Sequence, residues 1–348
     1  MSFWPEGDRG FQEALRVLKD NTSSLDNAEV FPTASLGVLG DAGVLGWVIP
    51  REYGGSEFSG AELVEGYLQL ARACLPTTFV LTQRNAACQR FALSENEPLK
   101  AELLPQLVGS ARFVTVGISH LTTSRQHLSQ PAVRVKLAEG RIQLDGVVPW
   151  VTGAGQADWV LTGGSCEDGR QVLVALPMDS RGITVLPAQD LLALDSSQTA
   201  SIQLENVLVD EGLLVAGPVE GVMHSGGRGG TGSLGTSALA LGAASASLER
   251  LAEEARNRPE LDEVLDLMTS EWEQVAGDVL SASGEAADSQ APELTNESLR
   301  QRSNSLVLRA AQAHLAASKG AGFTASHSAS RSVRESMFFL VWSCPQAV

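Results

Sequence analysis

Four cysteines and five histidines are the residues of this chain that could do thiol chemistry or supply sulfur and nitrogen ligands to a metal. The cysteines are Cys74, Cys88, Cys166 and Cys344. No two of them form a Cys-x-x-Cys pair, and none stands at metal-ligand spacing from a histidine. His120 and His127 are the one close histidine pair, and no third ligand stands near them in their polar segment. We therefore expect no metal site, and four reduced thiols in a reducing compartment.

A glycine-rich run at residues 226–232, Gly-Gly-Arg-Gly-Gly-Thr-Gly, could bring backbone amides close to a phosphate. The run lacks the Lys-Ser/Thr ending of a phosphate-binding loop, and it does not directly follow a strand pattern. We therefore interpret it as a flexible hinge between two structural units, with a phosphate loop as the alternative.

The elements that must position any site begin with a helical region. Apolar residues recur at helical spacing over residues 11–109, for example in the segment 63–71. Residues 59–62 fit a capping box, in which a Ser and a Glu each bond the other's backbone N–H. Residues 94–97, followed by Pro98, fit a second capping box. This part of the chain is predicted to be helix and turn only.

Between residues 111 and 214 the hydrophobic period changes to two, and β-branched residues become common. Strands are expected over residues 133–137, 142–146, 172–176 and 183–185. Glu139 and Gly140 suit a tight turn between the first two of these strands. Strands at this spacing, without helices between them, favour a small barrel or sandwich.

The helical period returns at about residue 235 and leads into a long helix. Gly242 and its small neighbours would allow another helix to approach this one closely. Residues 281–296 are polar and interrupted by Gly and Pro, which predicts an exposed connector. Two further helices are expected, over residues 297–319 and 328–342.

Three segments of the chain carry recognisable motifs. Residues 46–55, Gly-Trp-Val-Ile-Pro-Arg-Glu-Tyr-Gly-Gly, resemble the G-x-x-x-P-x-x-Y-G-G signature in the N-terminal helical domain of the acyl-CoA dehydrogenase family. Residues 145–160 contain the Trp-x-Thr and glycine turn against which the family lays its flavin ring, and residues 201–209 resemble its last β strand. The resemblance implies an α+β fold with an N-terminal helical domain over 1–109, a middle β-barrel or sandwich domain over 110–214 and a C-terminal helical bundle over 215–348.

The resemblance also implies FAD, held between the β domain and the C-terminal helices. The candidate cofactor-binding residues are then Val116, Ile118, Ser119, Ser124, Arg125, Trp150, Val151 and Thr152. The Ser119 hydroxyl could donate to a ring carbonyl. Trp150 would pack on the ring, and Thr152 would bond near its reactive nitrogen. Trp150 could instead be a core tryptophan of the β domain.

The chain departs from the family pattern on the phosphate side. The family carries an E-P-G-x-G run after the strand that here ends near Ser119, and residues 120–124, His-Leu-Thr-Thr-Ser, replace it. The glycines that would let backbone approach a phosphate are therefore missing. Arg125 could compensate, because a guanidinium matches phosphate geometry.

The catalytic base is a second departure. The family's dehydrogenases remove the weakly acidic α-proton of an acyl thioester with a placed glutamate. That slot falls on Ser343 here, and the family's second location falls near Gly235 and Thr236, so neither carries a carboxylate. Ser343 is the candidate catalytic residue by position, although an unactivated serine is not a base at neutral pH. Glu335 is the nearest carboxylate in sequence, and we expect it to pair with Arg334.

The sequence therefore predicts a flavin-dependent oxidoreductase that acts on an acyl thioester or a related CH–CH donor. Ordinary dehydrogenation should be impaired because the usual glutamate is missing. Two alternatives stay open. One is a flavin monooxygenase on the same fold, which would not need the glutamate. The other is a non-catalytic member of the family that binds an acyl group or a partner protein.

Composition narrows the list of partners. A net charge of −16 argues against nucleic acid, because phosphate binding needs clustered Lys and Arg. No window approaches eighteen uninterrupted apolar residues, so no transmembrane helix and no membrane partner are expected. The first nine residues lack the features of a signal peptide. We expect a cytoplasmic protein and, as the resemblance implies, a homodimer or homotetramer.

Overall fold

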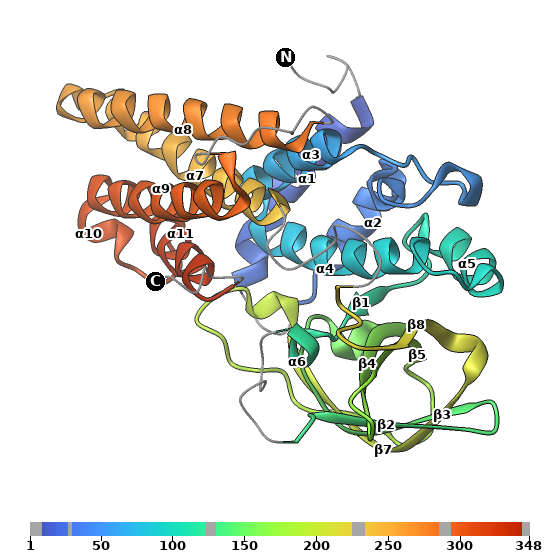
Figure 1. Cartoon of the computed structure of the whole chain (residues 1–348). Helices are drawn as coiled ribbons and strands as arrows, with labels where there is room; N and C mark the ends of the chain where they lie inside the picture. Colours follow the sequence, from blue (N-terminus) through green and yellow to red (C-terminus); the bar gives the residue numbers. More distant parts are fainter. Residues whose placement is uncertain (1–8, 27–29, 123–129, 225–233, 285–293, 343–348) are drawn as a thin grey trace.

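The computed structural model of the chain describes residues 9–26, 30–122, 130–224, 234–284 and 294–342. The expected order of a helical region, a β region and a second helical region is confirmed. Figure 1 shows that helices from both ends of the chain gather on one side of the β domain. The two helical regions, which are far apart in sequence, therefore form one body in space.

The N-terminal helices are α1 (Arg9–Asn21), α2 (Thr33–Asp41), α3 (Gly60–Ala73), α4 (Leu75–Ala92) and α5 (Glu97–Leu103), with 3-10 turns η1 (Thr22–Asp26), η2 (Val44–Gly46), η3 (Arg51–Tyr53) and η4 (Leu104–Leu107). The capping box that begins α3 is confirmed. The Ser59 backbone N–H donates to Glu62 Oε2 at 2.7 Å, and the Glu62 N–H donates to Ser59 Oγ at 3.3 Å.

The second predicted capping box is wrong. Asn96, and not Ser94, caps α5, because its side-chain oxygen accepts from the Leu99 N–H at 3.2 Å. The Ser94 hydroxyl donates instead to the Val215 carbonyl at 2.6 Å. The Ser94 side chain thus binds the β domain, and Asn96, the residue directly before the helix, supplies the cap.

A buried arginine connects the N-terminal helices. Arg84 on α4 is 1% exposed, and its guanidinium donates to the carbonyls of Leu45 and Leu107. The neighbouring Asn85 donates to the Tyr67 hydroxyl at 2.8 Å, and burial raises the pKa of Tyr67 to about 12. These hydrogen bonds offset part of the cost of burying the guanidinium, although Arg84 Nε has no partner among the described residues, and they hold α4 against the loops around it.

The middle region forms one sheet. Its strands are β1 (Val114–Val116), β2 (Val133–Ala138), β3 (Arg141–Val151), β4 (Trp159–Cys166), β5 (Gln171–Pro177), β6 (Ile183–Val185), β7 (Ala200–Asp210) and β8 (Leu214–Val219). They pair in the order β6-β7-β3-β2-β4-β5-β8, and β1 pairs with β4. The β1–β4 and β2–β4 pairs are parallel and the others antiparallel. Buried apolar side chains of β2, β3, β4, β5 and β7 pack together as the hydrophobic core of the β domain.

Local turn chemistry follows the sequence in this region, but two details differ. Glu139 and Gly140 both have positive φ, 53° and 74°, as a tight turn between β2 and β3 requires. A short helix, α6 (Ser119–Thr122), interrupts the region in which no helix was expected. The last strand continues past the boundary expected at Leu214 and ends at Val219. Further 3-10 turns are η5 (Ala154–Gln156), η6 (Asp195–Ser197) and η7 (Glu211–Leu213).

The C-terminal elements are α7 (Leu234–Ala255), η8 (Pro259–Leu261), α8 (Asp262–Ser283), α9 (Asn296–Ala317), α10 (Lys319–Gly322), α11 (Ser328–Met337) and η10 (Phe338–Leu340). The predicted connector over residues 281–296 is too long at its first end, since α8 continues to Ser283. The rest of the connector lies mostly outside the described residues.

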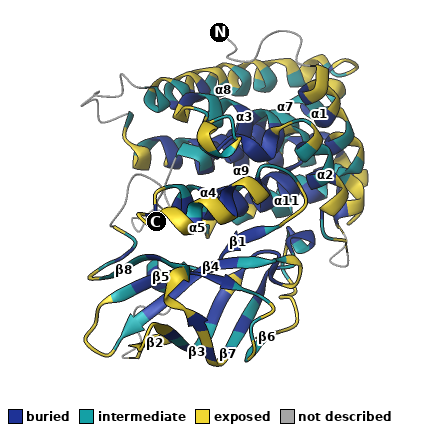
Figure 2. Ribbon diagram, turned by 90° about the vertical axis from the view of Figure 1, so that its right-hand side faces the viewer, coloured by how far each residue is buried: buried dark blue, intermediate teal, exposed yellow. Residues whose placement is uncertain are grey.

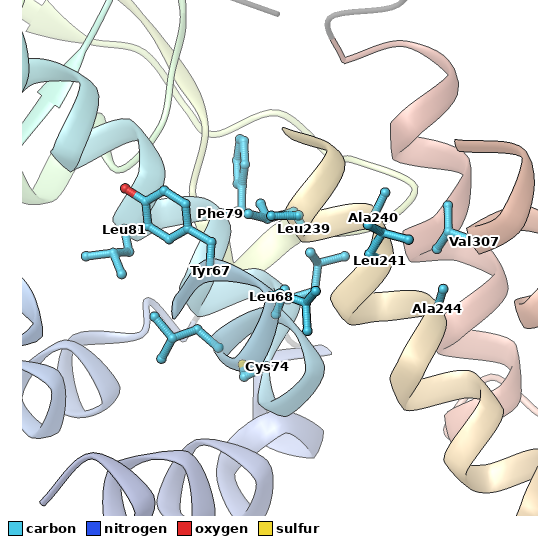
Figure 3. Packing of buried hydrophobic residues seen from close by; sticks show 14 of the residues in the cluster. Tyr67, Leu68, Cys74, Phe79, Leu81, Leu239, Ala240, Leu241, Ala244 and Val307 are labelled. Carbon is cyan, nitrogen blue, oxygen red and sulfur yellow. The ribbon is translucent and has the colours of Figure 1, made fainter. Parts of the chain in front are cut away.

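One hydrophobic core joins the two helical regions. Figure 3 shows α7 between the α3–α4 pair and α9, with Leu68 facing Leu241 and Ala244 beside Val307. Gly242 permits this packing, because a Cβ there would lie 2.4 Å from the Leu68 carbonyl oxygen. A second cluster joins α4 and α5 to β1, β4, β5 and β8. The β domain is thus attached to the helices through apolar packing.

Burial follows this arrangement. In Figure 2 the buried residues run through α3, α4, α7 and the strands, whereas α8 buries only Val275, Ala276 and Val279. Within the described part of the chain, no helix combines the length and the apolar character needed to cross a membrane.

Candidate functional site

β1 lies on the side of the β domain that faces the helices (Figure 1), and the residue after it, Gly117, lies close to Val148 and Val151 at the end of β3. Gly117 follows β1, and its N–H donates to the Leu161 carbonyl at 2.8 Å. A Cβ at Gly117 would lie 2.7 Å from a methyl group of Val148, so only glycine lets the two strands cross here. Ser119 then opens α6, and its hydroxyl donates to the Pro149 carbonyl at 3.1 Å. The structure therefore brings Ser119 beside the segment that carries Trp150.

Trp150 is presented outward from the end of β3. Its φ is 56° and its side chain is 53% exposed. The register between β3 and β7 shifts between Val148 and Val151, which marks an irregularity at this point. A positive φ is rare for a bulky residue and must be held by its surroundings. The interpretation of Trp150 as a core tryptophan is therefore wrong, and its indole offers an aromatic face at the surface of the domain junction.

Thr152 lies at the buried side of the same turn. It is 3% exposed, and its hydroxyl lies 3.3 Å from that of Thr199, which in turn lies 2.8 Å from the hydroxyl of Ser197. The Gly153 N–H donates to the Ser197 carbonyl at 2.8 Å. A chain of hydroxyls thus connects the turn to η6. Sequence reasoning missed Ser197 and Thr199, although the polar run before β7 was a visible signal.

Three candidate residues contribute core rather than a free side chain. Val116 is buried among the residues that join the helices to the sheet, and Ile118 packs against the same cluster. Val151 is fully buried in the core of the β domain. A ligand at this junction could meet only the backbone of Val116 and Val151. Ser124 and Arg125, expected near the phosphates, lie outside the described residues.

His120 anchors the segment that replaces the family's glycine-rich run. Its Nε2 lies 3.0 Å from the Gly163 carbonyl on β4. Thr162 on the same strand donates to the Gly117 carbonyl at 2.6 Å. A side chain and a strand hydroxyl therefore fix the path that leads out of β1. The position of His120 could not be predicted, because a periodic pattern does not report which distant strand a side chain contacts.

The two expected positions of a base carry no carboxylate in the sequence. Thr236 is buried in the first turn of α7 beside Gly235, and the buried Ser237 hydroxyl has no hydrogen-bond partner among the described residues. Ser343 lies outside the described residues. The first turn of α7, as far as the structure describes it, therefore carries no carboxylate that could serve as the base.

The expected ion pair between Glu335 and Arg334 is wrong. Arg334 lies 3.6 Å from an Asp26 carboxylate oxygen, and Arg331 lies 3.4 Å from the other oxygen of Asp26. Arg331 also donates to the Thr22 carbonyl at 3.0 Å. One carboxylate of η1 therefore binds both arginines of α11. Glu335 has no ion pair with any described residue.

Aromatic packing fixes the residue that precedes the expected base. The Trp342 ring stacks on that of Phe338, with centroids 5.0 Å apart and an interplanar angle of 21°. It meets the Phe79 ring of α4 edge-on at 5.3 Å and 88°. The chain that leads to Ser343 is therefore held against α4. The four-residue spacing of Phe338 and Trp342 was the sequence signal for this contact.

The residues at the domain junction fit a flavin ring. Trp150 supplies an exposed aromatic face, Ile118 supplies a partly buried apolar contact, and Ser119 supplies a hydroxyl. Because the Ser119 hydrogen is donated to Pro149, its oxygen is better placed to accept from a ring N–H than to donate to a ring carbonyl. Polar atoms at the edge of an apolar surface are the usual composition of a cofactor site.

The chain is similar in sequence and in fold to known proteins. Residues 12–110 match the family model described as acyl-CoA dehydrogenase, N-terminal domain. The chain is 25% identical over 259 residues to the probable acyl-CoA dehydrogenase YngJ of Bacillus subtilis, covering 70% of this chain and 66% of that protein. The match thus spans just under two thirds of that relative's length.

Two solved structures show how far the fold is shared. A glutaryl-CoA dehydrogenase from Mycobacterium smegmatis in complex with FADH2 has a TM-score of 0.82 and 19% identity, covering 98% of this chain and 92% of that chain. Dibenzothiophene monooxygenase from Paenibacillus sp. A11-2 has a TM-score of 0.79 and 18% identity, covering 95% and 92%. At these identities the likeness establishes the fold, and that fold carries more than one kind of oxidation.

Proposed function

We propose that this chain, as a divergent member of the acyl-CoA dehydrogenase family, is a flavin-dependent oxidoreductase acting on an acyl thioester. The single observation that carries the proposal is the meeting of Ser119 and Pro149, which places the exposed Trp150 at the junction of sheet and helices. Two similar proteins are named a probable acyl-CoA dehydrogenase and a glutaryl-CoA dehydrogenase. These names support an acyl thioester as the substrate.

The cofactor we propose is FAD. Trp150 would pack on the ring, the Ser119 oxygen would accept a ring N–H, and Thr152 would contribute through the hydroxyl chain that ends at Ser197. Ser124 and Arg125 would lie nearer the phosphates. When bound, FAD would supply a two-electron acceptor for the substrate. The contribution of this chain is then to hold the ring on a rigid turn and to exclude water from its buried side.

Proton abstraction is where this chain should differ from an ordinary dehydrogenase. A placed carboxylate contributes about a hundred- to ten-thousand-fold to the rate of such a step. The sequence has Ser343 in one expected slot, and Gly235 and Thr236 at the other. We therefore propose slow or undetectable α,β-dehydrogenation of straight-chain acyl-CoAs by the natural protein.

The experiment that tests the function uses the purified full chain. A yellow protein whose released cofactor is FAD would support the flavin proposal. Anaerobic addition of acyl-CoAs of different chain lengths, followed by stopped-flow absorbance, would then show whether any thioester reduces the flavin. Colourless protein that does not take up added FAD would contradict the proposal.

A flavin monooxygenase is the second candidate, and a specific observation favours it. The described start of α7 offers no carboxylate, and a monooxygenase of this fold is among the structures similar to the chain. Oxygen incorporation needs no α-proton base. With reduced flavin supplied as the two-electron donor and the second oxygen atom leaving as water, product that contains oxygen from O₂ would support this candidate over the first, provided that acyl-CoA does not reduce the flavin anaerobically. A member that binds FAD but shows neither reaction would leave a non-catalytic binding role.

We also propose a homodimer or homotetramer in a reducing, cytoplasmic environment. The resemblance to the family supports self-association, and the exposed Leu267 on α8 and Phe323 after α10 are candidate contact residues, at 66% and 83% exposure. Cys74, Cys88 and Cys166 are unpaired, which supports a reducing compartment. Mass photometry of the purified protein tests the assembly.

A further inference from the structure

A cavity of about 260 Å³ lies among the helices, remote from the β domain. Its walls come from α1 and η1, the end of α3 and the start of α4, α7 and α11, and no residue of the described β strands lines it. Small residues such as Ala71, Ala243 and Ala246 keep it open, and the hydroxyls of Ser328 and Ser332 make part of the wall polar. A space of this size admits a small organic molecule.

Most charged groups that line the cavity are already paired. Arg72 forms an ion pair with Glu249, and Lys19 lies 3.5 Å from the same carboxylate. Arg331 is held by Asp26 and by the Thr22 carbonyl. These groups are therefore explained as structural contacts between α1, α3, α7 and α11.

Two lining groups of opposite charge are not paired. Arg250 on α7 forms no hydrogen bond or ion pair with any described side chain, and neither does Glu335 on α11. They do not pair with each other, although both line the same cavity. Glu253 also lines it, but its side chain is exposed to solvent. A ligand that carries both a negative and a positive charge would compensate these two partly buried groups together.

We propose that this cavity binds a small zwitterion of the α-amino-acid class, with its carboxylate against Arg250 and its ammonium against Glu335. A guanidinium matches a carboxylate in a bidentate geometry, and a carboxylate is the natural partner of an ammonium. The hydroxyl and alanine walls suit a small side chain. The site is separate from the proposed flavin site, so the proposal does not depend on the oxidoreductase function.

The surroundings of Glu335 give the binding a defined pH dependence. Burial raises the pKa of Glu335 to about 7, and Asp26 adds to this while Arg331 and Arg334 oppose it. The Cys74 thiol, also near this carboxylate, has its own pKa raised by burial. An ammonium binds the charged carboxylate, so affinity should rise with pH. With one such proton, affinity at pH 8 should exceed that at pH 6 by about tenfold.

Isothermal titration calorimetry on the full-length natural protein tests the proposal, with a panel of the standard L-amino acids as probes. L-threonine has two matched analogues. 3-Hydroxybutyrate lacks its ammonium, and 1-amino-2-propanol lacks its carboxylate. We expect saturable binding of at least one small amino acid, and at least tenfold weaker binding of analogues that lack either charged group.

Variants locate the site. Arg250→Gln and Glu335→Gln should each weaken binding at least tenfold. Arg141→Gln and Glu263→Gln remove the same charges from exposed positions outside the cavity, and should bind as the natural protein does. The natural protein alone gives the pH profile and the analogue comparison, so the test does not depend on the folding of a variant. The proposal is overturned if no amino acid binds, if both analogues bind equally well, or if both cavity variants retain full affinity.

Discussion

The Ser119 hydroxyl donates to the Pro149 carbonyl at 3.1 Å, and this bond joins the start of α6 to the end of β3. Pro149 directly precedes Trp150, whose backbone has a positive φ. The bond therefore helps to hold a conformation that costs energy for a bulky residue. The proposed flavin site is a junction of two strand ends, and it exists only because β1 and β3 cross at Gly117.

Replacing Trp150 with Ala should lower the flavin content of the purified protein. An aromatic stacking contact contributes about 0.5–1.5 kcal/mol, so its loss should weaken FAD binding by up to roughly tenfold. Trp159, partly buried at the start of β4, is the control, because Trp159→Ala removes an indole away from the turn. The measurement is the ratio of flavin to protein absorbance after dialysis. Equal flavin retention in both variants would count against the site.

Placing a carboxylate at position 343 should restore proton abstraction. If FAD and the thioester are bound as proposed, Ser343→Glu should raise the rate of flavin reduction by acyl-CoA by about a hundredfold or more. Glu335→Gln should leave that rate unchanged, because Glu335 lines a cavity built from helices alone. Stopped-flow reduction measures both. Fast reduction in the natural protein that Glu335→Gln alone abolishes would show that Glu335 is the base.

The close crossing of α3 and α7 should not tolerate a methyl group. In Gly242→Ala the new Cβ would lie 2.4 Å from the Leu68 carbonyl oxygen and 2.7 Å from Ala71 Cβ. Overpacking of this kind costs about 1–3 kcal/mol of unfolding free energy. Gly277 on α8 has no neighbour within 4 Å, so Gly277→Ala should stabilise the protein by up to about 1 kcal/mol. Denaturant unfolding of both variants checks the opposite signs, and destabilisation of both equally would refute the packing argument.

Glu335 should make the stability of the protein decline with pH. Its pKa is raised from 4.5 to about 7 in the folded state, so the folded protein favours the neutral carboxyl. The associated stability is fully present below pH 4.5 and is lost as the pH rises through 7. The total loss is at most about 3 kcal/mol. Glu335→Gln should remove this part of the decline.

The unfolding free energy of the natural protein and the Glu335→Gln variant, measured between pH 5 and pH 8, tests this. Their difference isolates the single group from other titrations. If the difference does not change over that range, the carboxyl is solvated and the electrostatic argument for the helical cavity is weakened.

Some of the site was predictable because it depends on local chain properties. The capping box at Ser59 and the turn at Glu139 and Gly140 follow from residue types at fixed offsets. The resemblance at Trp150 likewise marked the segment that the structure places at the domain junction. Partners far apart in sequence were less predictable. Asp26 binds Arg331 and Arg334 across about three hundred residues, and no periodic pattern reports such a pairing.

The sequence by itself determined which stretches are helix and which are strand, since hydrophobic period and turn chemistry are properties of neighbouring residues. Only the tertiary structure decided that the first and last helices share one core, that Trp150 faces outward, and that Arg250 and Glu335 line one cavity without pairing. The physical reason is that burial and charge pairing depend on distances in space. Those distances are set by how the helices cross, which here depends on contacts such as that between Gly242 and Leu68.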